Sequence, residues 1–76
     1  MIVRVHHEGR EYLVEAPHGA RVVRTSGEDC LVFNYQGVQE FLLTPIAVML
    51  ARDGAKGLRL VSEGPPDLPI DEEGPG

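Results

Sequence analysis

Apolar and polar residues alternate along most of the chain, in short runs separated by turns that contain glycine or proline. A period of two is typical of half-buried β-strands, whose successive side chains point to opposite faces of a sheet. Six runs are therefore predicted to form strands, at residues 2–7, 10–15, 21–25, 30–35, 38–43 and 58–61. The two-residue connections Glu8–Gly9 and Gln36–Gly37 are short enough to make hairpins of the strands that they join.

The segment TPIAVMLARDG, residues 44–54, changes to the period of an α-helix. Thr44 is a good N-cap, Pro45 suits the first helical turn, and Gly54 fits the position just past the last turn. Three large apolar residues fall on one face of this helix and are expected to pack on the sheet: Ile46, Met49 and Leu50.

These elements predict an α+β fold, a small and mostly antiparallel β-sheet of about five to six strands with two hairpins and one short covering helix near residues 45–53. Residues 1–62 are expected to form a single domain, and residues 63–76 an acidic tail rich in proline and glycine. An alternative interpretation begins the helix at Val38 and kinks it at Pro45. We prefer a strand over 38–43 because proline clashes with the preceding helical turn, but the local sequence leaves both states open.

The apolar pattern of the second hairpin predicts a homo-oligomer. Both alternate sets of its residues contain bulky apolar side chains, and one short helix covers only one face of a sheet. Six residues make up the candidate oligomer face: Leu31, Val32, Phe33, Phe41, Leu42 and Leu43. A chain of 76 residues has a marginal core, so we expect a second copy to cover this face. Barrel-like curling of the sheet is the alternative.

The net charge of −5 is concentrated in the tail, where five of the twelve acidic residues follow the last basic residue, Arg59. The body then holds seven acids and seven bases, so we do not expect it to bind nucleic acid, which requires a basic excess. The most apolar window, FLLTPIAVML, is too short to span a membrane, and no signal peptide is expected. A single cysteine, Cys30, favours the cytoplasm, and six arginines against one lysine are a weak marker of a thermophilic bacterium.

Three histidines and three glutamates lie within VRVHHEGREYLVEAPHG, residues 3–19, and suggest a metal or acid–base site. Adjacent strand residues point to opposite faces, so His6 and His7 are not expected to share a metal. The turn at residues 8–9 sets His6 opposite Glu11, which is typical of a solvated ion pair. A metal would need His18 as a third ligand without the spacing of known zinc motifs, and we predict no metal site.

No catalytic set and no cofactor motif is found. Cys30 is interpreted as a small apolar strand residue, and RDGAKG lacks the pattern of a phosphate-binding loop. In the tail, PPDLPIDEE contains Leu68 and Ile70, a candidate motif for docking as an extended peptide, although a solvated terminus explains it as well.

The sequence therefore favours a small non-enzymatic protein-interaction or regulatory module, whose partner is itself or another protein. The alternative is a small-molecule or metal-binding protein, or a minor enzyme, that uses the candidate polar surface of His6, Glu11 and His18.

Overall fold

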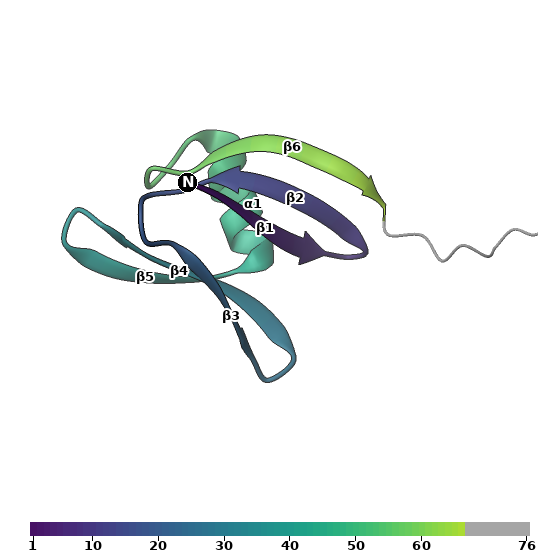
Figure 1. The fold of residues 1–76 in the computed structure, drawn as a ribbon, viewed down its shortest axis with the longest axis horizontal. Coiled ribbons are helices and arrows are strands. Elements are labelled where there is room, and N and C mark those ends of the chain that lie inside the picture. The colour runs from purple at the N-terminus through teal and green to yellow at the C-terminus, as the bar shows by residue number, and fades with distance from the viewer. Residues whose placement is uncertain (67–76) are drawn as a thin grey trace, which may run out of the picture.

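The computed structural model describes residues 1–66, which form six β-strands and one α-helix (Figure 1). The elements in chain order are β1 (Ile2–His7), β2 (Arg10–Glu15), β3 (Arg21–Thr25), β4 (Glu28–Tyr35), β5 (Val38–Leu43), α1 (Thr44–Asp53) and β6 (Arg59–Pro66). The strands make two antiparallel sheets, sheet A with the order β1-β2-β6 and sheet B with the order β3-β4-β5. The predicted α+β fold is confirmed, and residues 38–43 are a strand.

The first hairpin has the register that its two-residue turn predicts. Val5 lies opposite Tyr12 and Val3 opposite Val14, so all four of these side chains share the buried face of sheet A. Glu8 and Gly9 both have positive φ, 51° and 72°, as a type I′ turn requires. Glu8 adopts this positive φ although it is not a glycine, because a type I′ turn matches the right-handed twist of the two strands that it joins.

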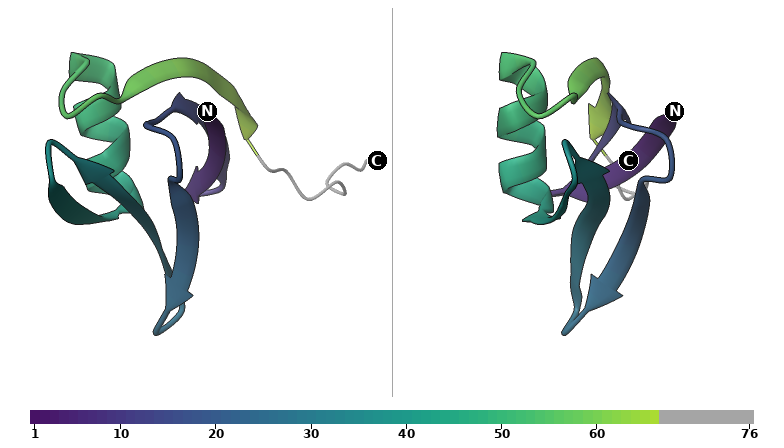
Figure 2. Two further views of the ribbon diagram at one scale, coloured as in Figure 1. Left: turned by 60° about the vertical axis from the view of Figure 1, so that its left-hand side comes forward. Right: turned by 90° about the vertical axis from the view of Figure 1, so that its left-hand side faces the viewer.

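A third hairpin joins β3 to β4, where the sequence suggests only a break between strands. Ser26 and Gly27 form its turn with φ values of 51° and 78°, and β4 begins at Glu28, two residues earlier than predicted. Sheet B is therefore a continuous meander of three strands. The hairpin of β3 and β4 projects away from the rest of the molecule (Figures 1 and 2).

The last strand is longer than predicted. β6 runs over Arg59–Pro66 and pairs with β2, with Glu63 opposite Tyr12, so the folded region continues past the expected boundary at residue 62. Arg10 supports this end by donating a hydrogen bond from Nη1 to the carbonyl oxygen of Gly64 at 3.1 Å. Leu58, which was expected to open the strand, lies in the preceding loop and is buried in the core. The candidate tail motif, Leu68 and Ile70, lies outside the described residues.

Helix α1 packs against both sheets (Figure 2), and the side chains that it buries are mostly small. Its buried residues are Thr44, Ala47, Val48 and Ala51. Ile46 and Met49 are 42% and 50% exposed, so the prediction that they pack on the sheet is wrong, whereas Leu50 is partly buried against the core. Small side chains let the helix axis approach two sheets closely, and this leaves the large residues of the predicted stripe at the periphery.

This arrangement predicts opposite tolerance on the two faces of α1. Ala47→Leu is expected to lower the free energy of unfolding by about 1–3 kcal/mol, because a fully buried alanine leaves no room for a larger side chain. Met49→Gln is expected to change it by less than about 0.5 kcal/mol. Urea unfolding of both variants measures the difference. Similar losses in both would contradict the assignment of the buried face.

Helix α1 begins at Thr44, as predicted, but its N-cap differs from the prediction. Leu43 occupies the N-cap position and makes no side-chain cap hydrogen bond, while Thr44 lies in the first turn and is buried. The Thr44 hydroxyl instead donates a hydrogen bond to the carbonyl oxygen of Asp29 in β4, at 3.2 Å. The end of the helix is as predicted: Gly54 is left-handed, and its N–H donates to the carbonyl oxygen of Ala51.

Thr44 therefore ties the helix to sheet B, and this bond can be tested. Thr44→Ala is expected to cost about 1 kcal/mol of unfolding free energy, because one buried hydrogen bond is lost and the Asp29 carbonyl loses its donor. Thr44→Ser, which keeps the hydroxyl, is the matched control and is expected to lose less in urea unfolding. An equal loss in both variants would assign the effect to the methyl group.

Candidate functional site

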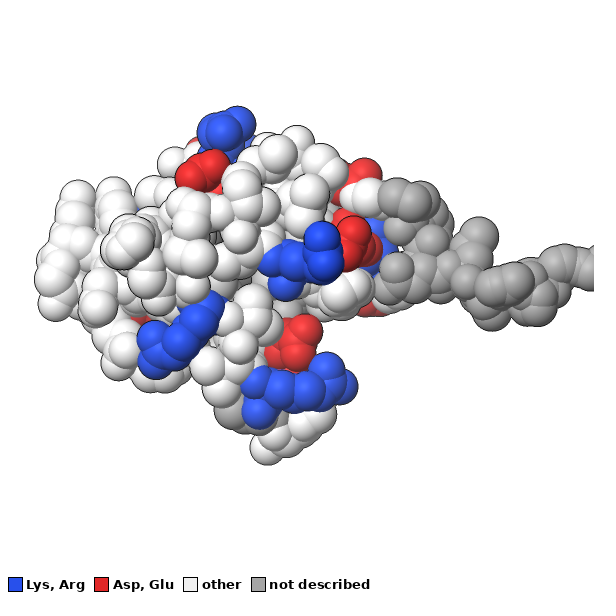
Figure 3. All heavy atoms as spheres, in the orientation of Figure 1, with Lys and Arg blue, Asp and Glu red and all other residues white. Residues whose placement is uncertain are grey.

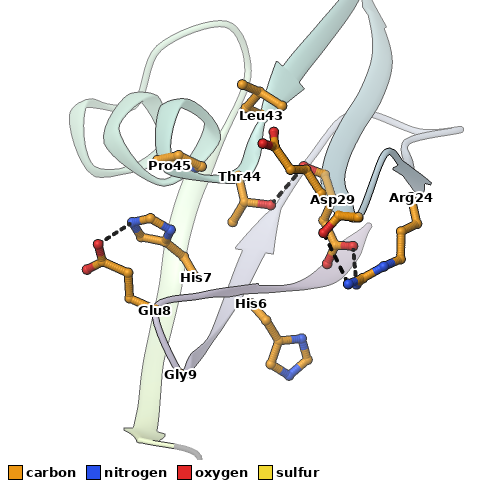
Figure 4. Close-up of a pocket in the computed structure, with 11 residues that line it drawn as sticks. His6, His7, Glu8, Gly9, Arg24, Asp29, Leu43, Thr44 and Pro45 are labelled. Atoms are coloured by element: carbon orange, nitrogen blue, oxygen red, sulfur yellow. Dashed lines mark hydrogen bonds and ion pairs between the residues drawn. The ribbon is translucent and has the colours of Figure 1, made fainter.

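Two features of the described residues are candidates for function, a pocket and an apolar sheet face. The pocket has a volume of about 480 Å³ and lies where the β1–β2 turn, the β3–β4 hairpin and the start of α1 meet (Figure 4). The β1–β2 hairpin and the helix start each contribute three of the lining residues named here, and the β3–β4 hairpin contributes its charged residues: His6, His7 and Glu8; Leu43, Thr44 and Pro45; Arg24, Glu28 and Asp29. Its size is in the range of small-molecule sites.

The polar groups of the pocket are largely engaged with one another. Arg24 Nη1 lies 3.1 Å from Asp29 Oδ1, and Arg24 Nη2 donates to the carbonyl oxygen of Gly27 at 3.1 Å. His7 Nε2 lies 3.9 Å from Glu8 Oε2. The ion pair of Arg24 and Asp29 joins the two strands of the β3–β4 hairpin. The pocket therefore offers imidazole and carboxylate groups on the β1–β2 hairpin, and a neutralised pair together with the exposed Glu28 carboxylate on the β3–β4 hairpin.

The predicted polar surface is divided between the two ends of β2. His6 and Glu11 lie opposite each other, with Nε2 and Oε2 3.8 Å apart, and the same Glu11 oxygen lies 2.7 Å from Arg4 Nε. His18 is exposed in the turn that follows β2, past the end of the strand away from Glu11. Glu15 lies four positions further along the strand than Glu11, a distance of roughly 13 Å, and His18 follows beyond it. The structure brings His6 and Glu11 together but not His18.

His6 and His7 point in different directions, as strand alternation predicts (Figure 4). His7 is on the side of the buried Val3 and Val5, whereas His6 is on the exposed side with Arg4. Within residues 1–66, no group of three or more histidine, cysteine, aspartate or glutamate residues is placed to hold a metal ion.

The apolar sheet face is the side of sheet B that points away from the core. We call it the outer face and define it by Val23, Cys30, Val32, Phe41 and Leu43. The strand register sets Val23, Cys30 and Leu43 in one row across the sheet, and Val32 and Phe41 in the next row. Phe41 is 63% and Leu43 45% exposed, while Val32 at the centre is 1% exposed.

The six residues of the candidate oligomer face divide between the two sides of sheet B. Leu31 and Phe33 are fully buried in the core of their own chain, and Leu42 packs against them. These three positions are therefore removed from the candidate surface, because alternation turns them inward. Val32, Phe41 and Leu43 remain on the outer face.

Charged side chains are distributed without a basic patch on the face shown in Figure 3, where most Lys and Arg side chains lie beside an Asp or Glu. The pairs include Arg24 with Asp29, Arg52 with Glu63, Lys56 with Glu40 and Arg59 with Glu15. Arg52 also joins α1 to β6, and its hydrogen bond with Glu63 raises the pKa of the guanidinium. The Met1 ammonium group, hydrogen-bonded to Glu15, lowers the pKa of that carboxyl. Both pairs are at the surface, away from the pocket.

The sequence alone does not identify the pocket, because its walls come from three segments that only the tertiary structure brings together. Its one sequence signal is the pair His6–His7 beside a turn, within the cluster of histidines and glutamates at residues 3–19. Comparisons with protein-family models, with curated proteins and with solved structures gave no match. Among the described residues there is no helix of the length and apolar character needed to cross a bilayer.

Proposed function

We propose that the protein is a non-enzymatic interaction module that acts as a homo-oligomer and buries the outer face of sheet B against a second copy. The observation that carries this proposal is the exposure of Phe41 and Leu43 on the side of sheet B opposite the core residues Leu31 and Phe33. A cluster of large apolar side chains on a small domain marks an association surface.

Energetics support a second copy as the occupant. The core of the chain consists mostly of valine and alanine, with Leu31, Phe33 and Leu58 as its largest fully buried residues. So small a core stabilises a domain only marginally, and small proteins commonly gain the remainder by oligomerisation. Each 100 Å² of apolar surface removed from water on the outer face contributes about 2.5 kcal/mol before association costs. Folding and association are therefore coupled.

Light scattering and thermal unfolding over a range of protein concentrations test this proposal. We expect a mass of more than one chain and a melting temperature that rises with concentration. Cys30 is a built-in reporter because it is partly buried on the outer face and is the chain's single cysteine. Its rate of alkylation by a maleimide should fall as the concentration rises. A monomeric mass with a constant melting temperature up to millimolar protein would overturn the proposal.

The pocket supports a second candidate function, the binding of a small polar molecule. In this candidate function, the ligand would contact His6, His7 and Glu8, which line the pocket. Glu11 and His18, which the sequence-based alternative included, would take no part. A thermal-shift screen with common metabolites and divalent metals separates the two functions. A ligand that stabilises the protein selectively, and that loses its effect in His7→Ala, would support the pocket.

A further inference from the structure

Two charged residues at the margin of the outer face lack a partner within the described part of their own chain. The side chains of Arg21 in β3 and Glu28 in β4 are exposed and make no hydrogen bond or ion pair with another described residue, and Glu28 also borders the pocket. Arg21 lies in the row of Val32, and Glu28 lies at the other end of the face, beyond the row of Cys30. The other charged groups of this hairpin, Arg24 and Asp29, are paired with each other.

The register fixes how these two charges are spaced. Along β4, the row of Val32 and the position of Glu28 are each two residues from Cys30, on opposite sides of it. Two residues of a strand span roughly 7 Å. The row of Cys30, Val23 and Leu43 is therefore midway between the cation and the anion.

Consider two copies whose outer faces meet, related by a two-fold axis that is perpendicular to the strands and passes over the row of Cys30. This axis exchanges the row that contains Arg21 with the row that contains Glu28. It places Arg21 over the end of the partner's hairpin, one strand away from the partner's Glu28. Facing sheets lie about 10 Å apart and neighbouring strands about 4.8 Å apart, which is within the combined reach of an arginine and a glutamate. By symmetry, the same contact forms twice.

The same operation also matches apolar groups. Val23, Cys30 and Leu43 lie over the same row of the partner, and Phe41 lies over the partner's junction of β5 and α1. A two-fold axis that runs parallel to the strands, over β4, would also bring the two outer faces together. It would set Glu28 against the partner's Glu28, and like charges directly opposite are destabilising. Electrostatics therefore favour the axis perpendicular to the strands.

We propose that the protein forms a two-fold dimer through the outer face, in which Arg21 of each copy pairs with the partner's Glu28. This inference rests on the proposed function and adds the symmetry of the assembly and the residues that determine its partner. The pairing gives a mostly apolar surface its register and its selectivity for a second copy of this chain.

Charge reversal with mixing tests the pairing. Arg21→Glu and Glu28→Arg each place two like-charged contacts in a homodimer, so each variant alone should dissociate roughly tenfold more readily than the wild type. An equimolar mixture of the two variants should associate as tightly as the wild type to within about threefold, because both contacts in the mixed dimer are then attractive. Sedimentation velocity at low ionic strength measures all three samples, and the affinities should converge at high salt.

Circular dichroism and urea unfolding of each variant serve as controls, because both side chains are exposed and make no hydrogen bond or ion pair with another described residue. If single reversals leave the affinity unchanged, or if mixing restores nothing, the pairing is overturned while the homo-oligomer stands. A wild-type chain that is monomeric throughout the concentration range overturns the proposed function itself. The two failures are therefore distinguishable.

Discussion

Replacing Phe41 by aspartate is expected to convert the oligomer to a folded monomer. Phe41 is 63% exposed in the single chain, so the substitution removes little that stabilises the monomer. In the assembly, it removes the largest apolar side chain of the outer face and forces a carboxylate into an apolar contact. A loss of about 2–4 kcal/mol, or roughly 30- to 1,000-fold in affinity, is expected for such a residue.

Val38→Asp is the matched control for this experiment. Val38 lies on the same strand and is similarly exposed, at 57%, but alternation places it on the opposite side of β5 from Phe41. Sedimentation should show a monomer for Phe41→Asp and an unchanged oligomer for Val38→Asp. Equal effects of the two variants would show that the outer face is not the contact surface.

Replacing Phe33 by alanine is expected to destabilise the fold severely. Phe33 is 1% exposed and belongs to the core between the two sheets and the helix. Removing a fully buried phenylalanine typically costs about 3–5 kcal/mol, which is comparable with the entire stability of a small domain. Urea unfolding should therefore show a protein that is largely unfolded near room temperature.

Phe41→Ala provides the comparison, because the two phenylalanines lie on adjacent strands and point to opposite faces. Below the concentration at which the protein associates, Phe41→Ala should cost less than about 1 kcal/mol. If Phe33→Ala were no more damaging than Phe41→Ala, the assignment of the inner and outer faces of sheet B would be wrong.

Local features of the sequence predict local features of the structure well. Glu8–Gly9 and the alternation on either side determine the register of the first hairpin down to the pair His6–Glu11. Gly54 correctly marks the end of α1. These features depend on residues that are close together in the chain, where turn geometry and side-chain period act directly.

The failed predictions depend on contacts between distant segments. The stripe of Ile46 and Met49 has the correct helical period, but the approach of two sheets selects the small face of Ala47 and Ala51 instead. The periodicity of apolar residues shows which residues share a face of the helix, but it does not show which face fits the space between the two sheets. The division of six strands into two sheets and the pocket between their ends depend on the same long-range packing.

The pairing of β2 with β6 has a consequence for how the chain folds. Arg10 and Gly64 are 54 positions apart, and the Arg52–Glu63 ion pair adds a contact between α1 and the same strand. Closing so long a loop costs entropy before any contact repays it, whereas two-residue hairpins close within microseconds. The three hairpins should therefore form early, and the docking of β6 should limit the folding rate. Until it docks, β2 presents an unpaired edge to other chains, so the nascent protein is especially prone to aggregation just before β6 is synthesised.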